Sequence, residues 1–174
     1  MEERKGIITA GGKPVNLLGN PIKVGDVAPD AIVVDNDQNT VHVDDFHGKV
    51  LVLASVPSLD TEVCNLETRR FNSEAAKLSP DVQILTISMD LPFAQKRWCG
   101  TAGVERVKTL SDHREASFGH AYGVLIKESR LLARAVFVVD KDGIVRYVQM
   151  VPDLGQEPQY EPVLDTVKKL SANQ

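Results

Sequence analysis

The stretch Val50–Val56 reads Val-Leu-Val-Leu-Ala-Ser-Val, and it constrains the fold more than any other part of the chain. A nearly continuous apolar run of this kind is typical of a strand that is buried on both faces of a sheet. Residues 62–78 follow with helical spacing, and Val82–Ser88 is the next apolar run. A strand, a helix and a strand in this order predict two parallel strands joined by a right-handed crossover.

The predicted helix over residues 62–78 has a start signal and one expected buried side. Asp60 and Thr61 are residues of the type that caps a helix N-terminus. Side chains that can face the sheet recur with a spacing close to 3.6 residues, which predicts the packed face of the helix. The members of that face are Val63, Leu66, Arg70, Phe71 and Ala75.

The rest of the chain predicts further strands and helices around this unit. Residues 1–25 alternate β-branched stretches with Gly and Pro turn signals, which indicates an N-terminal β-hairpin. Asp140–Gly143 ends in Asp-Gly, a strong hairpin signal. The other predicted elements are strands over Val41–Val43, Val107–Leu110, Ala133–Val139 and Ile144–Val151, and helices beginning near Leu91–Pro92 and spanning Ala116–Tyr122 and Tyr160–Leu170. This order predicts an α/β thioredoxin-like fold, with a central mixed β-sheet flanked by helices and the hairpin as an extension.

Length and charge exclude several classes of protein. A chain of 174 residues suits one domain, so we expect a single domain over 1–174 with 1–25 as its hairpin extension. The formal net charge of −4 argues against nucleic acid and anionic membranes as partners, because both favour a basic surface. The longest apolar run, Val50–Leu59, is too short for a membrane span, and the N-terminus has no apolar signal core. We therefore expect a cytoplasmic protein.

Cys64 lies where a buried strand is followed by the first turn of a predicted helix. The unpaired N–H groups of a helix N-terminus stabilise a thiolate, and ligands of α/β sheets bind beyond the carboxyl ends of the strands. An inert cysteine packed in the core is the alternative, which the position of Cys64 leaves open. Ionisation alone raises the thiolate fraction of an ordinary thiol only about 30-fold at pH 7, so rapid chemistry also needs donors such as Thr61 or an arginine.

The segment that contains Cys64 resembles the active-site signature of the peroxiredoxins. Pro57, Thr61 and Cys64 match Pro-x-x-x-Thr-x-x-Cys, and the fuller string Pro-Ser-Leu-Asp-Thr-x-Val-Cys is similar to the thiol peroxidase subfamily. The resemblance covers nearly the whole chain. Further matching stretches are Met89–Gln95 leading to Cys99–Gly100, Ala121–Val124 and Ala133–Val136.

The resemblance implies a role for each matching residue. Cys64 corresponds to the peroxidatic cysteine, whose thiolate attacks the O–O bond and becomes a sulfenic acid. Thr61 corresponds to the residue that hydrogen-bonds thiolate and peroxide, and Pro57 to the residue that shields the pocket. Arg134 corresponds to the arginine that stabilises the thiolate and polarises the peroxide. A core-edge salt bridge is the alternative for Arg134, which we expect inside the strand over Ala133–Val139, where a charge is costly without a partner.

Cys99 corresponds to the resolving cysteine, which forms an intramolecular disulfide with Cys64. The resemblance further implies that the first turns of both helices partly unfold for closure, because a disulfide needs Cα atoms within about 7 Å. A spectator thiol in a fraying helix is the alternative for Cys99. The implied activity is thioredoxin-dependent reduction of hydrogen peroxide and organic hydroperoxides by a homodimer, in antioxidant defence.

Two other classes of protein remain open at this stage. One is a redox sensor whose cysteines oxidise slowly, and the other is a thioredoxin-fold binding module with inert cysteines. His113 and His120 fit no common zinc spacing with the cysteines, so we expect no metal. The implied chemistry needs no cofactor.

Overall fold

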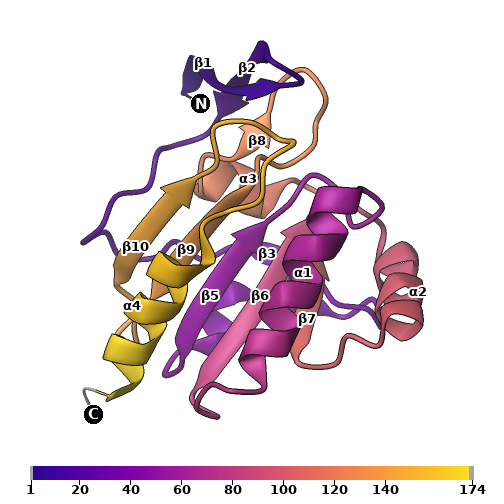
Figure 1. The fold of residues 1–174 in the computed structure, drawn as a ribbon. Coiled ribbons are helices and arrows are strands. Elements are labelled where there is room, and N and C mark those ends of the chain that lie inside the picture. The colour runs from indigo at the N-terminus through magenta and orange to yellow at the C-terminus, as the bar shows by residue number, and fades with distance from the viewer. Residues whose placement is uncertain (1, 173–174) are drawn as a thin grey trace.

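A mixed sheet of seven strands forms the centre of the molecule (Figure 1). The structure is a computed structural model that describes residues 2–172. In spatial order the strands are β10 (Val145–Met150), β9 (Ala135–Val139), β5 (Val50–Ser55), β6 (Val82–Ser88), β7 (Val107–Ser111), β3 (Ile32–Val34) and β4 (Thr40–His42). β5, β6 and β7 run parallel, and the remaining neighbours pair antiparallel. The predicted β-α-β unit and mixed sheet are confirmed.

Two helices cover one face of this sheet. α1 (Glu62–Ala75) and α4 (Tyr160–Ala172) lie in front of the strands in Figure 1, and α2 (Pro92–Ala102) lies beside β7. Alternate side chains of β5, Val50, Val52 and Ala54, pack in one core cluster with Phe71 of α1 and Val163 of α4. This alternation explains why β5 is apolar throughout, because each face of the strand belongs to a different packed layer.

The opposite face packs against the N-terminal hairpin and a short helix. β1 (Glu3–Ala10) and β2 (Lys13–Leu18) form the predicted hairpin, and β8 (Leu125–Ile126) adds a third strand to it. Ile8 and Leu17 of the hairpin share a core cluster with Leu53 of β5 and with Phe118 of α3 (Ser117–Ala121). The hairpin is therefore held by apolar burial as well as by strand pairing. Met1, Asn173 and Gln174 of the predicted domain lie outside the described residues.

Several sequence predictions differ from the structure in detail. The strand predicted over Val41–Val43 is β4, and Val43 instead begins a 3₁₀-helix over Val43–Phe46. The predicted packed face of α1 is wrong at Leu66, which is 50% exposed, and the buried residues of α1 are Cys64, Glu67, Thr68 and Phe71. Polar atoms on the inner side of α1 break the apolar pattern from which that face was predicted.

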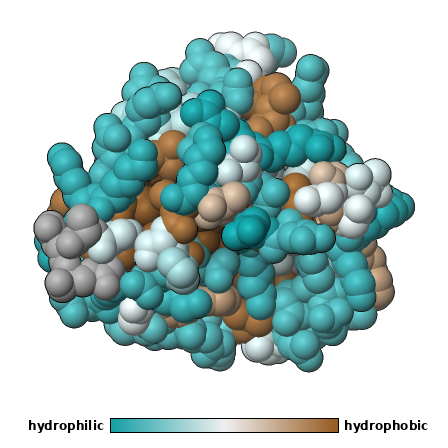
Figure 2. All heavy atoms as spheres, turned by 60° about the horizontal axis from the view of Figure 1, so that its bottom comes forward, coloured by the Kyte–Doolittle hydropathy of each residue, from teal (hydrophilic) through white to brown (hydrophobic). Residues whose placement is uncertain are grey.

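The lower end of the molecule in Figure 1 presents a largely hydrophilic surface. Figure 2 shows this end, where hydrophilic residues cover most of the face and hydrophobic side chains are visible only in small areas between them. Within residues 2–172, no helix combines the length and the apolar character needed to cross a bilayer.

Candidate active site

Cys64 lies in the first turn of α1, immediately beyond the carboxyl end of β5. The chain leaves β5 through the buried residue Pro57, turns, and enters α1 with Thr61 as the N-cap. The Thr61 Oγ1 accepts a hydrogen bond from the Cys64 backbone N at 3.4 Å and donates one to the Ser58 carbonyl at 2.8 Å. The Cys64 side chain is buried beside Val56 and Leu59. The predicted cap and the predicted position of Cys64 are confirmed.

The guanidinium of Arg134 faces the Cys64 sulfur. Its Nη1 lies 3.1 Å from the Cys64 Sγ, and its Nη2 donates to the Leu154 carbonyl at 2.7 Å. β9 begins at Ala135, which pairs with Ser55 at the end of β5, so Arg134 immediately precedes β9. The prediction that Arg134 lies inside a strand is therefore wrong. Strand pairing still brings Arg134 and the Cys64 loop together at the same end of the sheet.

The guanidinium of Arg134 also contacts a buried glutamate, Glu67. The Glu67 Oε1 accepts a hydrogen bond from the same Arg134 Nη1 at 3.1 Å, and the side chains of both residues are only 1% exposed. Burial raises the pKa of Glu67 to about 7, although Arg134 acts in the opposite direction. One buried cation thus faces two groups that can carry negative charge. Charge balance is closest when one of them, Cys64 or Glu67, is ionised and the other is neutral.

Glu67 is a residue of the site that was not predicted from the sequence. A glutamate in a helix is normally placed on the solvent side, since ionised side chains are rarely buried without a partner. One signal was available: Glu67 follows Cys64 by three residues, and residues three apart lie on the same side of a helix. The salt bridge considered as the alternative for Arg134 therefore exists, together with the contact to Cys64.

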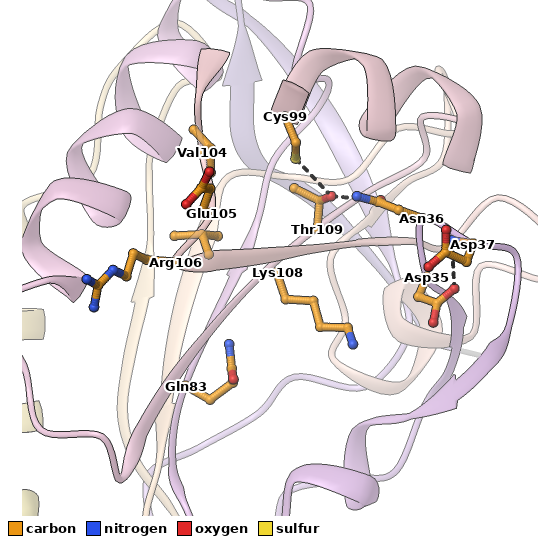
Figure 3. Close-up of a pocket in the computed structure, with 11 residues that line it drawn as sticks. Asp35, Asn36, Asp37, Gln83, Cys99, Val104, Glu105, Arg106, Lys108 and Thr109 are labelled. Atoms are coloured by element: carbon orange, nitrogen blue, oxygen red, sulfur yellow. Dashed lines mark hydrogen bonds between the residues drawn. The ribbon is translucent and has the colours of Figure 1, made fainter. Parts of the chain in front are cut away.

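Cys99 lies in a different environment, on the carboxyl-terminal half of α2. Its Sγ lies 3.4 Å from the Thr109 Oγ1, which in turn donates to the Asn36 Oδ1 at 2.9 Å. The cysteine is half-buried and lines a cavity of about 420 Å³ between α2, β7 and the β3–β4 turn (Figure 3). Both cysteines, which are within the described residues, are free thiols.

The structure thus brings together four of the five predicted site residues at one end of the sheet and leaves the fifth on α2. Pro57, Thr61 and Cys64 belong to the β5–α1 junction, and Arg134 reaches them from the start of β9. Trp98, next to Cys99, packs partly against the Val56–Leu59–Cys64 cluster. Among residues 2–172, no group of three or more His, Cys, Asp or Glu side chains is arranged to hold a metal ion.

Comparison with known proteins gives the chain a family. Residues 23–164 match the family model described as Redoxin. A thiol peroxidase from Oceanobacillus iheyensis is 56% identical over 162 residues, which are 93% of this chain and 98% of that protein. A thiol peroxidase from Bacillus subtilis is 53% identical over 163 residues, 94% of this chain and 97% of that protein.

A solved structure agrees with this match. The peroxiredoxin-like protein from Aquifex aeolicus superposes with a TM-score of 0.89 at 44% identity, covering 96% of this chain and 99% of that one. The predicted thioredoxin-like fold is thereby confirmed. The chain belongs to the Redoxin family and, within it, to the thiol peroxidases, which are enzymes of the peroxiredoxin type.

Proposed function

We propose that the chain reduces hydroperoxides through a sulfenic acid at Cys64 and an intramolecular Cys64–Cys99 disulfide that thioredoxin re-reduces. The observation that carries this proposal is the 3.1 Å contact between the Arg134 Nη1 and the Cys64 Sγ in a buried site. A permanently charged guanidinium stabilises a thiolate strongly where water is excluded. It is also placed to stabilise the negative charge that develops on the peroxide oxygen during attack.

The proposed cycle has three chemical steps, and atoms and electrons balance in each of them. The Cys64 thiolate attacks one peroxide oxygen, the O–O bond breaks, and the other oxygen leaves as an alcohol or water after protonation. The sulfur is then a sulfenic acid, and the Cys99 thiol condenses with it to form an S–S bond and release water. A dithiol reductant exchanges with the disulfide and restores two thiols while it is itself oxidised to a disulfide.

Thr61 and Pro57 have supporting roles in this proposal. The Thr61 hydroxyl accepts a hydrogen bond from the Cys64 N–H and donates one to the Ser58 carbonyl. These two bonds fix the position of the hydroxyl one turn before the Cys64 sulfur, where it can hydrogen-bond a bound peroxide. The buried ring of Pro57 lies just beyond the end of β5 and excludes water from that side. Both roles follow the family resemblance.

Disulfide closure requires movement of the segments that carry the cysteines. The Cys64 sulfur faces Arg134, whereas the Cys99 sulfur contacts Thr109. The expectation that the first turns of both helices open is wrong for α2, because Cys99 is in its carboxyl-terminal half. We propose instead that α2 opens from its end at Gly103, a C-cap with a φ of 69°. Helix ends open at low free-energy cost.

Hydrogen peroxide and organic hydroperoxides are the proposed substrates, and antioxidant defence is the proposed role. Thioredoxin as the reductant and a cytoplasmic location stay predictions. We also propose that residues 1–174 form one domain, which the core cluster shared by the hairpin and the sheet supports.

The proposed homodimer is supported by three exposed apolar side chains near the site, on α1 and at the start of α2. They are Leu66, Leu91 and Phe93, with exposed fractions of 50%, 53% and 64%.

Variants of the two cysteines test the proposed cycle. Cys64→Ser is expected to lose peroxide reduction altogether in an assay coupled to thioredoxin and its reductase. Cys99→Ser is expected to consume about one equivalent of peroxide per chain and then to stall, because no disulfide forms for thioredoxin to reduce. Substantial turnover in Cys64→Ser would remove Cys64 from the proposed role, and full turnover in Cys99→Ser would show that another group resolves the sulfenic acid.

A further inference from the structure

Asp90 lies between β6 and α2 and accepts hydrogen bonds from both sides of the active site. Its Oδ1 accepts from the Ser58 Oγ at 2.7 Å, and its Oδ2 accepts from the Leu59 backbone N at 2.8 Å. The Ser88 Oγ donates to the same Oδ2 at 2.7 Å. Three short hydrogen bonds to one carboxylate are stronger than their neutral counterparts, so Asp90 holds its neighbours firmly.

On one side, these bonds determine where the Cys64 loop lies. Ser58 and Leu59 belong to the turn between β5 and α1. The Ser58 carbonyl accepts from both the Oγ1 and the backbone N of Thr61, at 2.8 and 3.2 Å. Thr61 in turn accepts from the Cys64 backbone N. Asp90 is therefore connected through the turn to the residues that fix the position of the Cys64 sulfur.

On the other side, the bonds continue into the helix that carries Cys99. The Ser88 Oγ, which donates to Asp90, accepts from the Gln95 Nε2 at 3.0 Å, and the same Nε2 donates to the Leu110 carbonyl at 2.9 Å. Gln95 is buried and precedes Cys99 by four residues, so the two lie on the same side of α2. Asp90 thus connects the Cys64 loop to the face of α2 that carries Cys99.

We propose that Asp90 is a positioning residue that holds the Cys64 loop and α2 in the geometry for peroxide attack, and that opposes disulfide closure until its hydrogen bonds are released. The proposal rests on the proposed function. Attack needs the Cys64 loop in place, whereas closure needs one or both cysteine segments to leave their positions. A carboxylate that is bonded to the Cys64 loop, and connected to α2 through Ser88 and Gln95, therefore favours the first step and slows the second.

The test is stopped-flow fluorescence of reduced protein mixed with hydrogen peroxide, comparing the wild type with Asp90→Asn. Trp98 is the only tryptophan, precedes Cys99 and packs on the Cys64 cluster, so it reports both steps. The peroxide-dependent phase measures attack, and the peroxide-independent phase measures closure. Asp90→Asn is expected to slow attack about tenfold and to accelerate closure about tenfold. A factor of about ten in rate corresponds to the loss of one hydrogen bond to a charged group.

Two further variants provide a second test of the hydrogen bonds and a matched control. Ser58→Ala removes one of the three hydrogen bonds and is expected to change both phases in the same directions, less strongly, even if Asp90→Asn does not fold. Asp140→Asn is the matched control, because Asp140 accepts from the backbone N of Asp142 and of Ile144 at the opposite end of the sheet. It is expected to leave both phases unchanged.

The outcomes separate a positioning role from a merely structural one. Attack slowed together with closure accelerated supports the proposal. Unchanged attack, or closure that is slowed or unchanged, overturns it, since general loosening of the fold would not accelerate one step while slowing the other. A wild type that reacts without forming the Cys64–Cys99 disulfide overturns the proposed function itself, and the role in closure with it.

Discussion

Replacing Glu67 with Gln is predicted to remove a loss of stability that the wild type suffers as the pH rises. Burial raises the pKa of Glu67 from its ordinary value of 4.5 to about 7 in the folded protein. The folded state therefore binds the proton more tightly than the unfolded state. The resulting stability is fully present below about pH 4.5 and is lost as the pH rises to about 7. Glutamine keeps the shape and the acceptor oxygen toward Arg134 but cannot titrate.

The size of the effect follows from the two values. At about 1.36 kcal/mol per pH unit, the interval from 4.5 to about 7 corresponds to roughly 3 kcal/mol in the free energy of unfolding. That is a large part of the roughly 5–15 kcal/mol that stabilises a typical domain. Burial also raises the pKa of Asp112, to about 6, but Asp112 is present in both proteins. Its contribution cancels when the wild type is compared with the variant.

Urea unfolding of both reduced proteins at several pH values between about 4 and 8 measures this difference. The stability of the wild type relative to Glu67→Gln is expected to fall by roughly 3 kcal/mol across the range. Glu62→Gln, at an exposed position of the same helix, controls for the loss of any carboxylate. A difference between wild type and Glu67→Gln that is constant with pH would refute the reasoning, because it would mean that attraction by Arg134 fully offsets the effect of burial and leaves the pKa of Glu67 unshifted.

Substitutions at three other positions have expected outcomes. Arg134→Met leaves Glu67 buried without its cation and is expected to lower the free energy of unfolding in urea by about 3–5 kcal/mol. The rate constant for reaction with peroxide is expected to fall at least ~100-fold. Near-normal peroxide kinetics would contradict the role of the guanidinium. Thr61→Ala removes the helix cap and is expected to cost about 1 kcal/mol, whereas Thr61→Ser is expected to retain that stability in the same assay. Gly19→Ala places a Cβ 2.3 Å from the His120 carbonyl oxygen at a φ of +101°, so thermal unfolding is expected to show a loss of roughly 2 kcal/mol or more; an unchanged midpoint would show that the backbone moves freely there.

The central part of the fold could be predicted because its signals are local and strong. Val50–Val56 is apolar on both faces, and the β-α-β order permits one handedness. β3 and β8 have three and two residues, which is too short for a periodic pattern, and neither was predicted. Their place in the sheets depends on pairing partners far away in the sequence, such as Leu17 and Leu18 for β8.

The position of Cys64 could be predicted more fully than its surroundings. The β5–α1 junction is one continuous segment, so its motif can be recognised directly in the sequence. Arg134 was assigned to a strand because its neighbours are apolar, yet strand pairing begins only at Ala135. Glu67 and Asp90 were not predicted as parts of the site. Glu67 contacts Arg134, which is 67 positions away in the sequence, and Asp90 contacts Leu59, which is 31 positions away. No local sequence pattern contains contacts over such separations.

The most direct test of the proposed cycle is to map the disulfide after one equivalent of hydrogen peroxide. The reduced protein is oxidised, its remaining thiols are alkylated, and the intact mass and the peptides are measured by mass spectrometry. The proposed cycle predicts a chain that has lost two hydrogen atoms, takes up no alkylating agent, and yields one peptide pair joined through Cys64 and Cys99. Two alkylated thiols, or a Cys64 that keeps added oxygen beside an alkylated Cys99, would contradict it.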